Sequence, residues 1–327
     1  MSGVTVIIPT WNRRDLLVRV MECLQKQTHP IEKIIVADDG STDGSAEAAE
    51  ERGATVLRMG TNAGFARAVN RGIAGAATEW VAIVNNDVEP EPDWLACLVA
   101  AAAGAGAWFA AGKLFLRGHP ARLDGTFDLV CRGGCAWRAG HGKPDSGVFS
   151  QPRRIAMTPF TAALFRKELF GRVGLLDEEF GSYLEDVEFG FRCAASGYDG
   201  VYVPDARAAH EGSATLGAWS GESVRLIARN QLLLIAKHFP RGWFRRFGWP
   251  VLVAQALWGV LALRHGAGPA WLRGKWQGLR RFNSVRKRSD AVRDSVAEFL
   301  GENDREILKL QRAGGFDSFW RWYFALT

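Results

Sequence analysis

Three acidic clusters stand at places in the sequence where they could do chemistry. They are Asp38-Asp39-Gly40-Ser41, Asn85-Asn86-Asp87-Val88-Glu89, and Glu185-Asp186. Carboxylates can accept hydrogen bonds from a nucleoside, ligate Mg²⁺ beside substrate phosphates, or take a proton from a hydroxyl. These are the tasks in transferring a group from a nucleotide diphosphate donor. Each cluster alone is explained equally well as an acidic turn, a helix cap or acids favoured by a helix dipole.

The first two clusters suit a nucleotide and a metal ion. A carboxylate in Asp38-Asp39 can accept hydrogen bonds from a base or ribose, and Gly40 lets the backbone approach the ligand. Asp87 is the natural Mg²⁺ ligand of the second cluster. His210 follows a predicted strand and could add an imidazole to the same metal, although a lone histidine is more often structural.

The third cluster suits a base at the start of a helix. Helical spacing puts Asp186 on a different face from Glu185 and Glu188. One carboxylate can therefore point into a cleft as a general base while another orients neighbours or pairs with Arg192.

Four predicted strands, alternating with amphipathic helices, must position these clusters. The strands are residues 4–8, 34–37, 55–57 and 80–84. Asn12 is predicted to cap a helix at 13–26, a second helix is predicted to run through Arg52, Asn62 to cap a third ending near 76, and Pro90 and Pro92 to open a fourth. This alternation is typical of a parallel sheet covered by helices. The first two clusters each follow a strand, so they should lie at the edge where open α/β sheets bind ligands.

Length and charge indicate one sizeable core plus a smaller basic region. The chain has 327 residues, of which 47% are hydrophobic, and a net charge of +6. Residues 241–289 hold eleven Lys or Arg and no Asp or Glu. The rest of the chain is slightly acidic, which argues against nucleic acid as a partner.

Residues 217–327 are predicted to be helical and to include a membrane-interface segment at 241–289. Within it, 247–263 carries no charge but is shorter than the roughly 20 residues that cross a bilayer. Basic residues on both flanks, interleaved with tryptophans, suit the headgroup region of an anionic membrane. The alternative is an ordinary buried helical hairpin. The aromatic tail 316–324 could pack on the core or form a homodimer contact.

Cysteine content and the N-terminus favour a cytoplasmic protein. Five cysteines in mostly apolar contexts are typical of unpaired thiols in a reducing compartment. Cys131 and Cys135 could begin a zinc site, but no second Cys or His pair stands at suitable spacing. The chain enters a strand directly, so no export signal is predicted.

Taken in order, five motifs resemble glycosyltransferase family 2, and Glu185-Asp186 with the segment 210–213 is similar to its rhamnosyltransferase-like branch. They are Val6 to Arg13, Asp38 to Asp43, Asn62 to Ala66, Asn85 to Pro90, and Glu185-Asp186. The resemblance implies a GT-A fold, an α/β Rossmann-like and mostly parallel sheet with flanking helices, and an inverting mechanism. One departure is that Asn85-Asn86-Asp87 supplies one acid where the family pattern has two.

The resemblance also implies roles for single residues. The donor-binding residues would be Pro9, Thr10, Asn12, Asp39, Arg67 and Asn86. Asp87 and His210 would hold Mg²⁺ or Mn²⁺, and Asp186 would be the base with Glu185 beside it.

We therefore expect a catalytic domain at 1–216, with its nucleotide-sugar half at 1–105 and its acceptor half at 106–216, before the helical region 217–327. The predicted reaction moves rhamnose or a hexose from a dTDP-, UDP- or GDP-linked donor to a glycan or polyprenyl-linked acceptor in cell-surface polysaccharide synthesis. The enzyme is expected in the cytoplasm, peripheral on the inner face of the membrane. Alternatives are a nucleotidyltransferase, which should carry a Gly-rich loop after the first strand, and a catalytically silent, membrane-associated sugar-binding protein.

Overall fold

Four parallel strands near the N-terminus form the part of the molecule that the sequence predicted most directly. The computed structural model describes residues 3–212, 217, 219–240, 242–288 and 296–327. The parallel strands are β1 (Val4–Thr10), β2 (Lys33–Asp38), β3 (Thr55–Arg58) and β4 (Trp80–Val84). The helices that follow them in turn are α1 (Arg14–Leu24), α2 (Ser45–Glu50), α3 (Phe65–Gly75) and α4 (Trp94–Ala105). The predicted alternation of strands and helices is confirmed.

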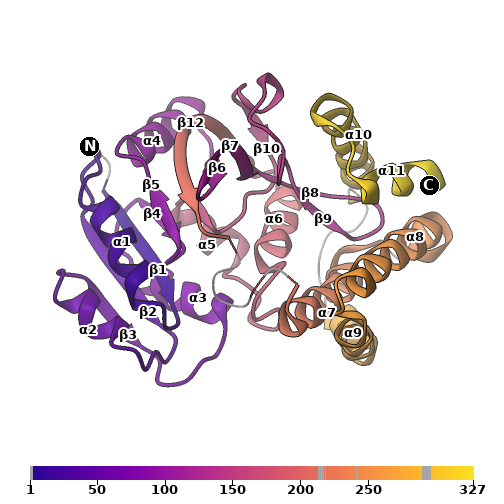
Figure 1. The fold of residues 1–327 in the computed structure, drawn as a ribbon, viewed down its shortest axis with the longest axis horizontal. Helices are drawn as coiled ribbons and strands as arrows, with labels where there is room; N and C mark the ends of the chain where they lie inside the picture. The colour runs from indigo at the N-terminus through magenta and orange to yellow at the C-terminus, as the bar shows by residue number, and fades with distance from the viewer. Residues whose placement is uncertain (1–2, 213–216, 218, 241, 289–295) are drawn as a thin grey trace. The chain divides into compact units, whose positions relative to one another are not determined.

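Beyond β4 the sheet continues with strands of both directions (Figure 1). Its order is β10-β12-β6-β11-β4-β1-β2-β3, with β5 paired to β12 and β7 paired to β6. The added strands are β5 (Val88–Pro90), β6 (Phe109–Leu116), β7 (His119–Gly125), β10 (Arg153–Ile155), β11 (Ala162–Arg166) and β12 (Gly200–His210). The same part of the chain has the helices α5 (Lys167–Val173) and α6 (Glu185–Ala195) and a 3₁₀ turn at Gly147–Phe149.

The two faces of β1 pack against different helices, because successive side chains of a strand point to opposite faces. Val4, Val6 and Ile8 join a buried core that includes residues of α1 and α4. Ile7 points to the other face, where a Cβ on Gly72 of α3 would lie 2.3 Å from its Cγ2. The sheet is therefore covered on both faces, and the first two polar clusters lie at the ends of β2 and β4.

Two helix starts differ from the prediction. The cap positions of α1 and α3 are Arg13 and Gly64, and no side chain caps either helix. The predicted caps Asn12 and Asn62 are therefore wrong. The Asn12 side chain instead accepts a hydrogen bond from the Thr42 N–H at 2.9 Å. A contact with the neighbouring turn has replaced local capping.

The chain forms two compact units that do not follow sequence order. One comprises residues 1–127 and 140–215, and the other comprises 128–139 and 216–327. The second unit holds α7 (Gly221–His238), α8 (Trp243–Arg264), α9 (Gly268–Arg288), α10 (Val296–Gly314), α11 (Ser318–Leu326) and a hairpin of β8 (Asp128–Val130) and β9 (Ala136–Arg138). The division expected at 216 left this hairpin with the first unit. Residues 213–216 at that boundary, and residues 241 and 289 at the ends of the basic segment, lie outside the described residues.

Glycines let α9 pack closely on α7. A Cβ on Gly274 would lie 2.2 Å from the carbonyl oxygen of Arg225, and one on Gly278 would lie 2.9 Å from that of Arg229. Because residues four apart share a helix face, this contact turns the opposite side of α9 outward. The exposed apolar residues on that side are Leu272, Trp276 and Leu279.

The helix α8 contains the uncharged segment 247–263. Its 22 residues make it the one helix among those described that is long and apolar enough to cross a bilayer. Of its most apolar stretch, 44% is buried inside the protein. A core helix of a soluble protein can be equally long and apolar, so length and composition alone do not make α8 a membrane span.

Candidate active site

The turns after β1 and β2 interlock. The Asn12 N–H donates to Ser41 Oγ at 2.7 Å, and the Thr42 N–H donates to the Asn12 side-chain oxygen at 2.9 Å. Asn12 and Arg13 both have positive φ, 58° and 65°, which is uncommon outside glycine. Such strained backbone gathers at functional sites and persists where the surroundings enforce it. Here the bonds from the second turn enforce it at Asn12.

Asp39 is buried directly after β2, and its carboxylate holds a loop. Its N–H donates to the carbonyl oxygen of Thr10, which follows Pro9 at the end of β1. Oδ1 accepts from the Ala63 N–H and Oδ2 from the Gly64 N–H, both at 2.8 Å. Burial raises the pKa of Asp39, although these two donors oppose the shift. Each oxygen keeps a second lone-pair site with which it could bind a ligand.

Arg67 and Asn86 both follow these residues in sequence and make different contributions. Arg67 is exposed in the first turn of α3, and its charge weakly opposes the burial that raises the pKa of Asp39. Asn86 is buried after β4, and its Nδ2 donates to the carbonyl oxygen of Asn12 at 3.3 Å. The turns after β1 and β4 are thereby joined.

Strand pairing brings Asp87 and His210 together from distant parts of the chain. β12 runs antiparallel to β5 with His210 opposite Val88, and the Glu211 N–H donates to the Asp87 carbonyl oxygen at 3.1 Å. Asp87 Oδ1 lies 3.3 Å from His210 Nε2, and each side chain is 8% exposed. Asp87 Oδ1 is buried and makes no hydrogen bond within the described residues.

The other ring nitrogen of His210 faces a second acid. Nδ1 lies 2.8 Å from Asp124 Oδ2. Burial favours the neutral ring, but the hydrogen bond to Asp124 and the carboxylate of Asp87 outweigh burial and raise the pKa of His210 to about 9.

The Asp87 and His210 pair suits a divalent cation. Once a cation displaces the proton that the raised pKa keeps on the ring, Asp87 Oδ1 and His210 Nε2 offer one O and one N ligand. Mg²⁺ typically takes one or two carboxylates, with substrate phosphates and water completing its ligands. Across the described ranges, no group of three or more His, Cys, Asp or Glu side chains could hold a metal. The residues therefore fit a cation whose other ligands come from a bound diphosphate and water.

Asp186 stands in the first turn of α6, after two strained residues. Tyr183 and Leu184 have positive φ values of 69° and 66°, and no side chain caps the helix. Asp186 Oδ1 accepts from the Val187 N–H at 2.8 Å. Glu185 is buried, whereas Asp186 is half-buried. Asp186 is thus the more accessible of the two predicted catalytic acids.

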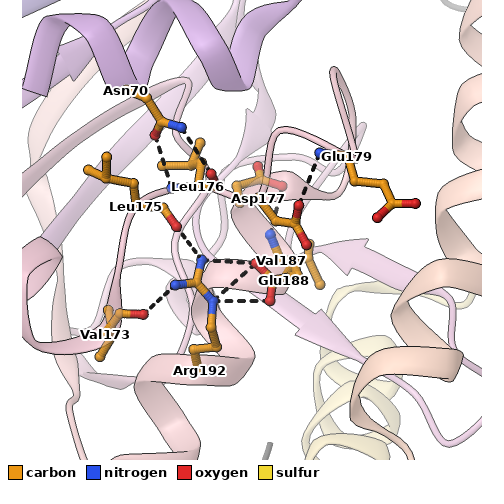
Figure 2. A network of polar contacts seen from close by, with 10 residues as sticks. Asn70, Val173, Leu175, Leu176, Asp177, Glu179, Val187, Glu188 and Arg192 are labelled. Carbon is orange, nitrogen blue, oxygen red and sulfur yellow. Dashed lines mark hydrogen bonds and ion pairs between the residues drawn. The ribbon is translucent and has the colours of Figure 1, made fainter. Parts of the chain in front are cut away.

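A polar network fixes the segment that leads into α6 (Figure 2). Arg192 binds the Glu188 carboxylate through Nε and Nη2 at 2.9 to 3.1 Å. It also donates to the carbonyl oxygens of Val173 and Leu175. Glu188 is fully buried. The pairing of an acid of this helix with Arg192 is therefore confirmed.

The same segment is tied to α3. Asn70 donates to the Leu176 carbonyl oxygen at 2.9 Å and accepts from the Leu176 N–H at 3.0 Å, as Figure 2 shows. The Ala66 N–H donates to the Gly181 carbonyl oxygen at 2.9 Å. The Asp39 carboxylate holds the loop before α3. The bond from Ala66 to Gly181 then ties the start of α3 to the segment before α6, so hydrogen bonds connect the turn after β2 with that segment.

A sequence model described as Glycosyl transferase family 2 matches residues 5–174, just over half of the chain. The chain belongs to glycosyl transferase family 2. The resemblance carried by the motifs is confirmed. The match ends before α6 and β12, so Asp186 and His210 lie outside it.

Two relatives of this family member are named as a rhamnosyltransferase and a chondroitin synthase. The chain is 29% identical over 291 residues to the N-acetylglucosaminyl-diphospho-decaprenol L-rhamnosyltransferase of Mycobacterium tuberculosis strain H37Rv, over 79% of this chain and 90% of the relative. It is 27% identical over 245 residues to chondroitin synthase of Escherichia coli, over 64% of this chain and 35% of the relative. The first alignment supports the similarity to the rhamnosyltransferase-like branch.

Solved structures agree in fold. The structure of GalNAc-T7 with UDP, GalNAc and Mn²⁺ superposes with a TM-score of 0.64 at 16% identity, over 97% of this chain and 58% of that chain. The mannosyltransferase PcManGT of Pyrobaculum calidifontis, in complex with GDP-Man and Mn²⁺, gives 0.53 at 18% identity, over 98% and 86%. The predicted GT-A fold of this family 2 glycosyltransferase is confirmed.

The structure joins most predicted residues and adds one that the sequence missed. Asn86 bonds to Asn12, and Asp87 faces His210. Asp124 was missed because the Gly-rich stretch from 107 to 151 shows no clear periodicity. Its neighbour Gly125 makes it look like a residue of an ordinary turn.

Proposed function

We propose that this family 2 glycosyltransferase is inverting, and that it moves rhamnose or a hexose from a dTDP-, UDP- or GDP-linked donor to a hydroxyl of a glycan or lipid-linked acceptor. The observation that carries the proposal is the buried pair of Asp87 and His210 beside the interlocked turns after β1, β2 and β4. Family membership favours glycosyl transfer over the nucleotidyl transfer that the sequence left open.

Donor binding uses the ends of three parallel strands. Pro9, Thr10, Asn12, Asp39, Arg67 and Asn86 would line the nucleoside and diphosphate side. Asp87 and His210 would hold Mg²⁺ or Mn²⁺ against the diphosphate. When bound, the cation neutralises charge that develops on the leaving group. The Mn²⁺ named with both solved structures supports this choice of metal.

The base is assigned to Asp186. It takes the proton of the acceptor hydroxyl as that oxygen attacks the anomeric carbon, opposite the departing diphosphate, so the configuration inverts. Its partial exposure at the start of α6 leaves it accessible, while the buried Glu185 supports the turn. The network around Arg192 fixes the preceding segment and so limits movement of the base.

We also propose a polyprenyl-linked acceptor and a cytoplasmic enzyme that is peripheral on the inner membrane face, within cell-surface polysaccharide synthesis. In α9, Leu272, Trp276 and Leu279 are 61%, 51% and 64% exposed. Basic side chains accompany them, and Arg280 lies 3.5 Å from the centroid of the Trp276 ring. An exposed apolar stripe bordered by cations suits the boundary between headgroups and acyl chains of an anionic bilayer. The lipid-linked substrate in the mycobacterial relative's name supports the same acceptor class.

A donor screen tests the transfer reaction. Wild type, Asp186→Asn and Glu168→Gln are assayed with dTDP-rhamnose, UDP-hexoses and GDP-mannose, with and without Mn²⁺. We expect Asp186→Asn to lower kcat by about 10²- to 10⁴-fold, the usual contribution of a general base. Glu168, an exposed acid of α5, serves as the control and should leave kcat unchanged. Full turnover by Asp186→Asn would remove the base assignment, and donor binding without turnover by wild type would favour the silent sugar-binding protein.

Flotation with vesicles of phosphatidylglycerol and phosphatidylcholine tests the docking. Wild type should float at low salt and be released as salt rises, because surface charges are screened. Leu272→Ser with Trp276→Ser should stay in the soluble fraction, whereas Leu175→Ser, an exposed leucine of the first unit, should float like wild type. A wild type that never floats refutes the docking.

A further inference from the structure

His210 is held between two acids, of which the sequence predicted one. Its Nε2 lies 3.3 Å from Asp87 Oδ1, and its Nδ1 lies 2.8 Å from Asp124 Oδ2. Asp124 is 4% exposed, so the contact is shielded from water. The imidazole thus has an acid on each of its nitrogens, inside the first unit.

Asp124 reaches the ring from an irregularity in β7. The pairing of β7 with β6 passes from Leu123 to Gly125, which leaves Asp124 as an extra residue in the ladder. Such a β-bulge re-aims a side chain, and bulges are frequent next to active sites. β12 pairs with the same end of β6, up to His210. Both side chains are therefore delivered by strands that share β6 as a neighbour.

A carboxylate on Nδ1 determines what Nε2 can do. When the Nδ1–H is donated to Asp124, the lone pair of the neutral ring lies on Nε2, which faces Asp87. Metal-binding histidines are commonly oriented by a carboxylate on their second nitrogen. His141 is a different case. It is largely exposed, with Nδ1 2.7 Å from the backbone oxygen of Asp124 and 3.6 Å from Oδ1.

We infer that Asp124 is a positioning residue that fixes the His210 ring with Nε2 directed at Asp87, so that the two can bind the divalent cation of the donor complex. The inference rests on the proposed function. Asp124 acts through His210 and touches neither substrate. Its effect should therefore show in metal binding even when no transfer takes place.

Electron paramagnetic resonance of unbound Mn²⁺, with UDP present, measures that binding without turnover. We expect Asp124→Ala to weaken the apparent Mn²⁺ affinity by about 10- to 100-fold, the usual effect of removing such a partner. Asp124→Asn keeps an oxygen that can accept the Nδ1–H, so it should recover most of the affinity. Wild-type affinity in Asp124→Ala overturns the inference, and so does an Asp124→Asn variant as weak as Asp124→Ala.

Matched variants separate this inference from the proposed function. Asp128 is similarly buried, and its Oδ1 lies 3.6 Å from Arg138 Nε in the second unit. Because this ion pair does not involve His210, Asp128→Ala should bind Mn²⁺ like wild type. If Asp87→Ala and His210→Ala also bind like wild type, the proposed metal site itself fails. If those two lose Mn²⁺ while Asp124→Ala keeps it, only the role of Asp124 fails.

A second measurement needs no variant of Asp124 and so holds even if Asp124→Ala does not fold. Ring ¹⁵N resonances of wild type, assigned with His210→Gln, report which nitrogen carries the proton once the ring is neutral. We expect the proton on Nδ1 and a bare Nε2. A neutral ring protonated at Nε2 overturns the inference.

Discussion

At the scale of single residues, the Asp39 carboxylate combines a structural role with a candidate role in ligand binding. Its oxygens accept the N–H groups of Ala63 and Gly64, so the loop before α3 depends on it. The same carboxylate is our candidate for nucleoside recognition. Loss of Asp39 should therefore affect stability as well as donor binding.

We expect Asp39→Ala to lower the free energy of unfolding by about 1–3 kcal/mol, because two donors in a partly buried loop lose their acceptor. Asp39→Asn, which keeps one acceptor oxygen, should fall between. Urea denaturation measures the change, and calorimetry with the donor nucleotide measures affinity. Asp15, exposed in the first turn of α1, provides the control Asp15→Ala. Unchanged stability in Asp39→Ala would contradict the role in holding the loop.

Single site residues could be predicted where a side chain suited to the chemistry stood just after a predicted strand. Asp39 and Asp87 come shortly after predicted strands, so their place at the strand ends could be inferred. The role of Asn12 as a cap could not be judged locally, because its partner Thr42 belongs to the next turn. The contact of Asp124 with His210 could not be predicted, because it depends on an irregularity in the pairing of β7 with β6 that the sequence does not show.

At the scale of elements, α6 depends on an ion pair that is buried on one side. Glu188 is fully buried, and the side chain of Arg192 is 19% exposed. A buried charge left without its partner typically costs 3–5 kcal/mol. Breaking the pair is therefore costly mainly because the Glu188 charge would stay buried without Arg192.

Arg192→Met should accordingly destabilise the protein by about 3–5 kcal/mol, since Glu188 then stays buried and unpaired by this cation. Glu188→Gln combined with Arg192→Met should be less destabilised than Arg192→Met alone. Chemical denaturation of the four members of the cycle measures the coupling. Additive losses would show that the two residues act independently.

The elements α7, α8 and α9 share a partly buried lysine. The Lys275 ammonium donates to the Ala228 carbonyl oxygen at 3.0 Å and to the side-chain oxygens of Gln231, at 2.8 Å, and Gln255. Burial among neutral acceptors lowers the pKa of Lys275 to about 8 from its ordinary 10.5. The folded state therefore releases this proton at a lower pH than the unfolded chain.

Between about pH 8 and 10.5 the unfolded chain binds more protons at Lys275 than the folded state does, so this residue should make stability rise with pH. The slope contributed is at most about 1.4 kcal/mol per pH unit. Urea denaturation of wild type and Lys275→Met across this range isolates it as their difference. Lys287→Met, at an exposed position of α9, should keep the wild-type slope. A difference that does not rise with pH would contradict the shifted pKa.

Elements were easier to predict than their ends. Strands β1 to β4 follow from short β-branched runs, and the region 217–327 was expected to be helical as a whole. The predicted helix caps were wrong where tertiary contacts replaced capping by a side chain. Residues 107–151 gave no clear pattern because glycines recur along the stretch and β8 and β9 have only three residues each, so β6 to β9 emerged only from the structure.

At the scale of the whole molecule, the chain passes between its two units three times, because 128–139 belongs with 216–327. The hairpin places Val130, Cys131, Cys135 and Trp137 in the interior of the second unit. A protein cut after residue 212 would keep these apolar side chains without the helices that cover them. Exposed apolar surface of this kind promotes association.

We therefore expect residues 1–212 alone to aggregate, and the same fragment with 128–139 replaced by a short Gly-Ser linker to be more soluble. Light scattering after size-exclusion chromatography distinguishes the two. Equal solubility would show that the hairpin does not need its helical partners.

The hairpin also sets an order of events on the ribosome. The Arg132 N–H donates to Asp304 Oδ1 at 3.0 Å, across 172 residues of chain. At roughly 5–20 residues per second of synthesis, that partner arrives on the order of ten seconds later. Asp304 is missing throughout this interval, and α8 is missing for much of it. The first unit therefore emerges with an unfinished insertion at its middle, and nascent chains of this protein should be captured by chaperones until the last helices have left the tunnel.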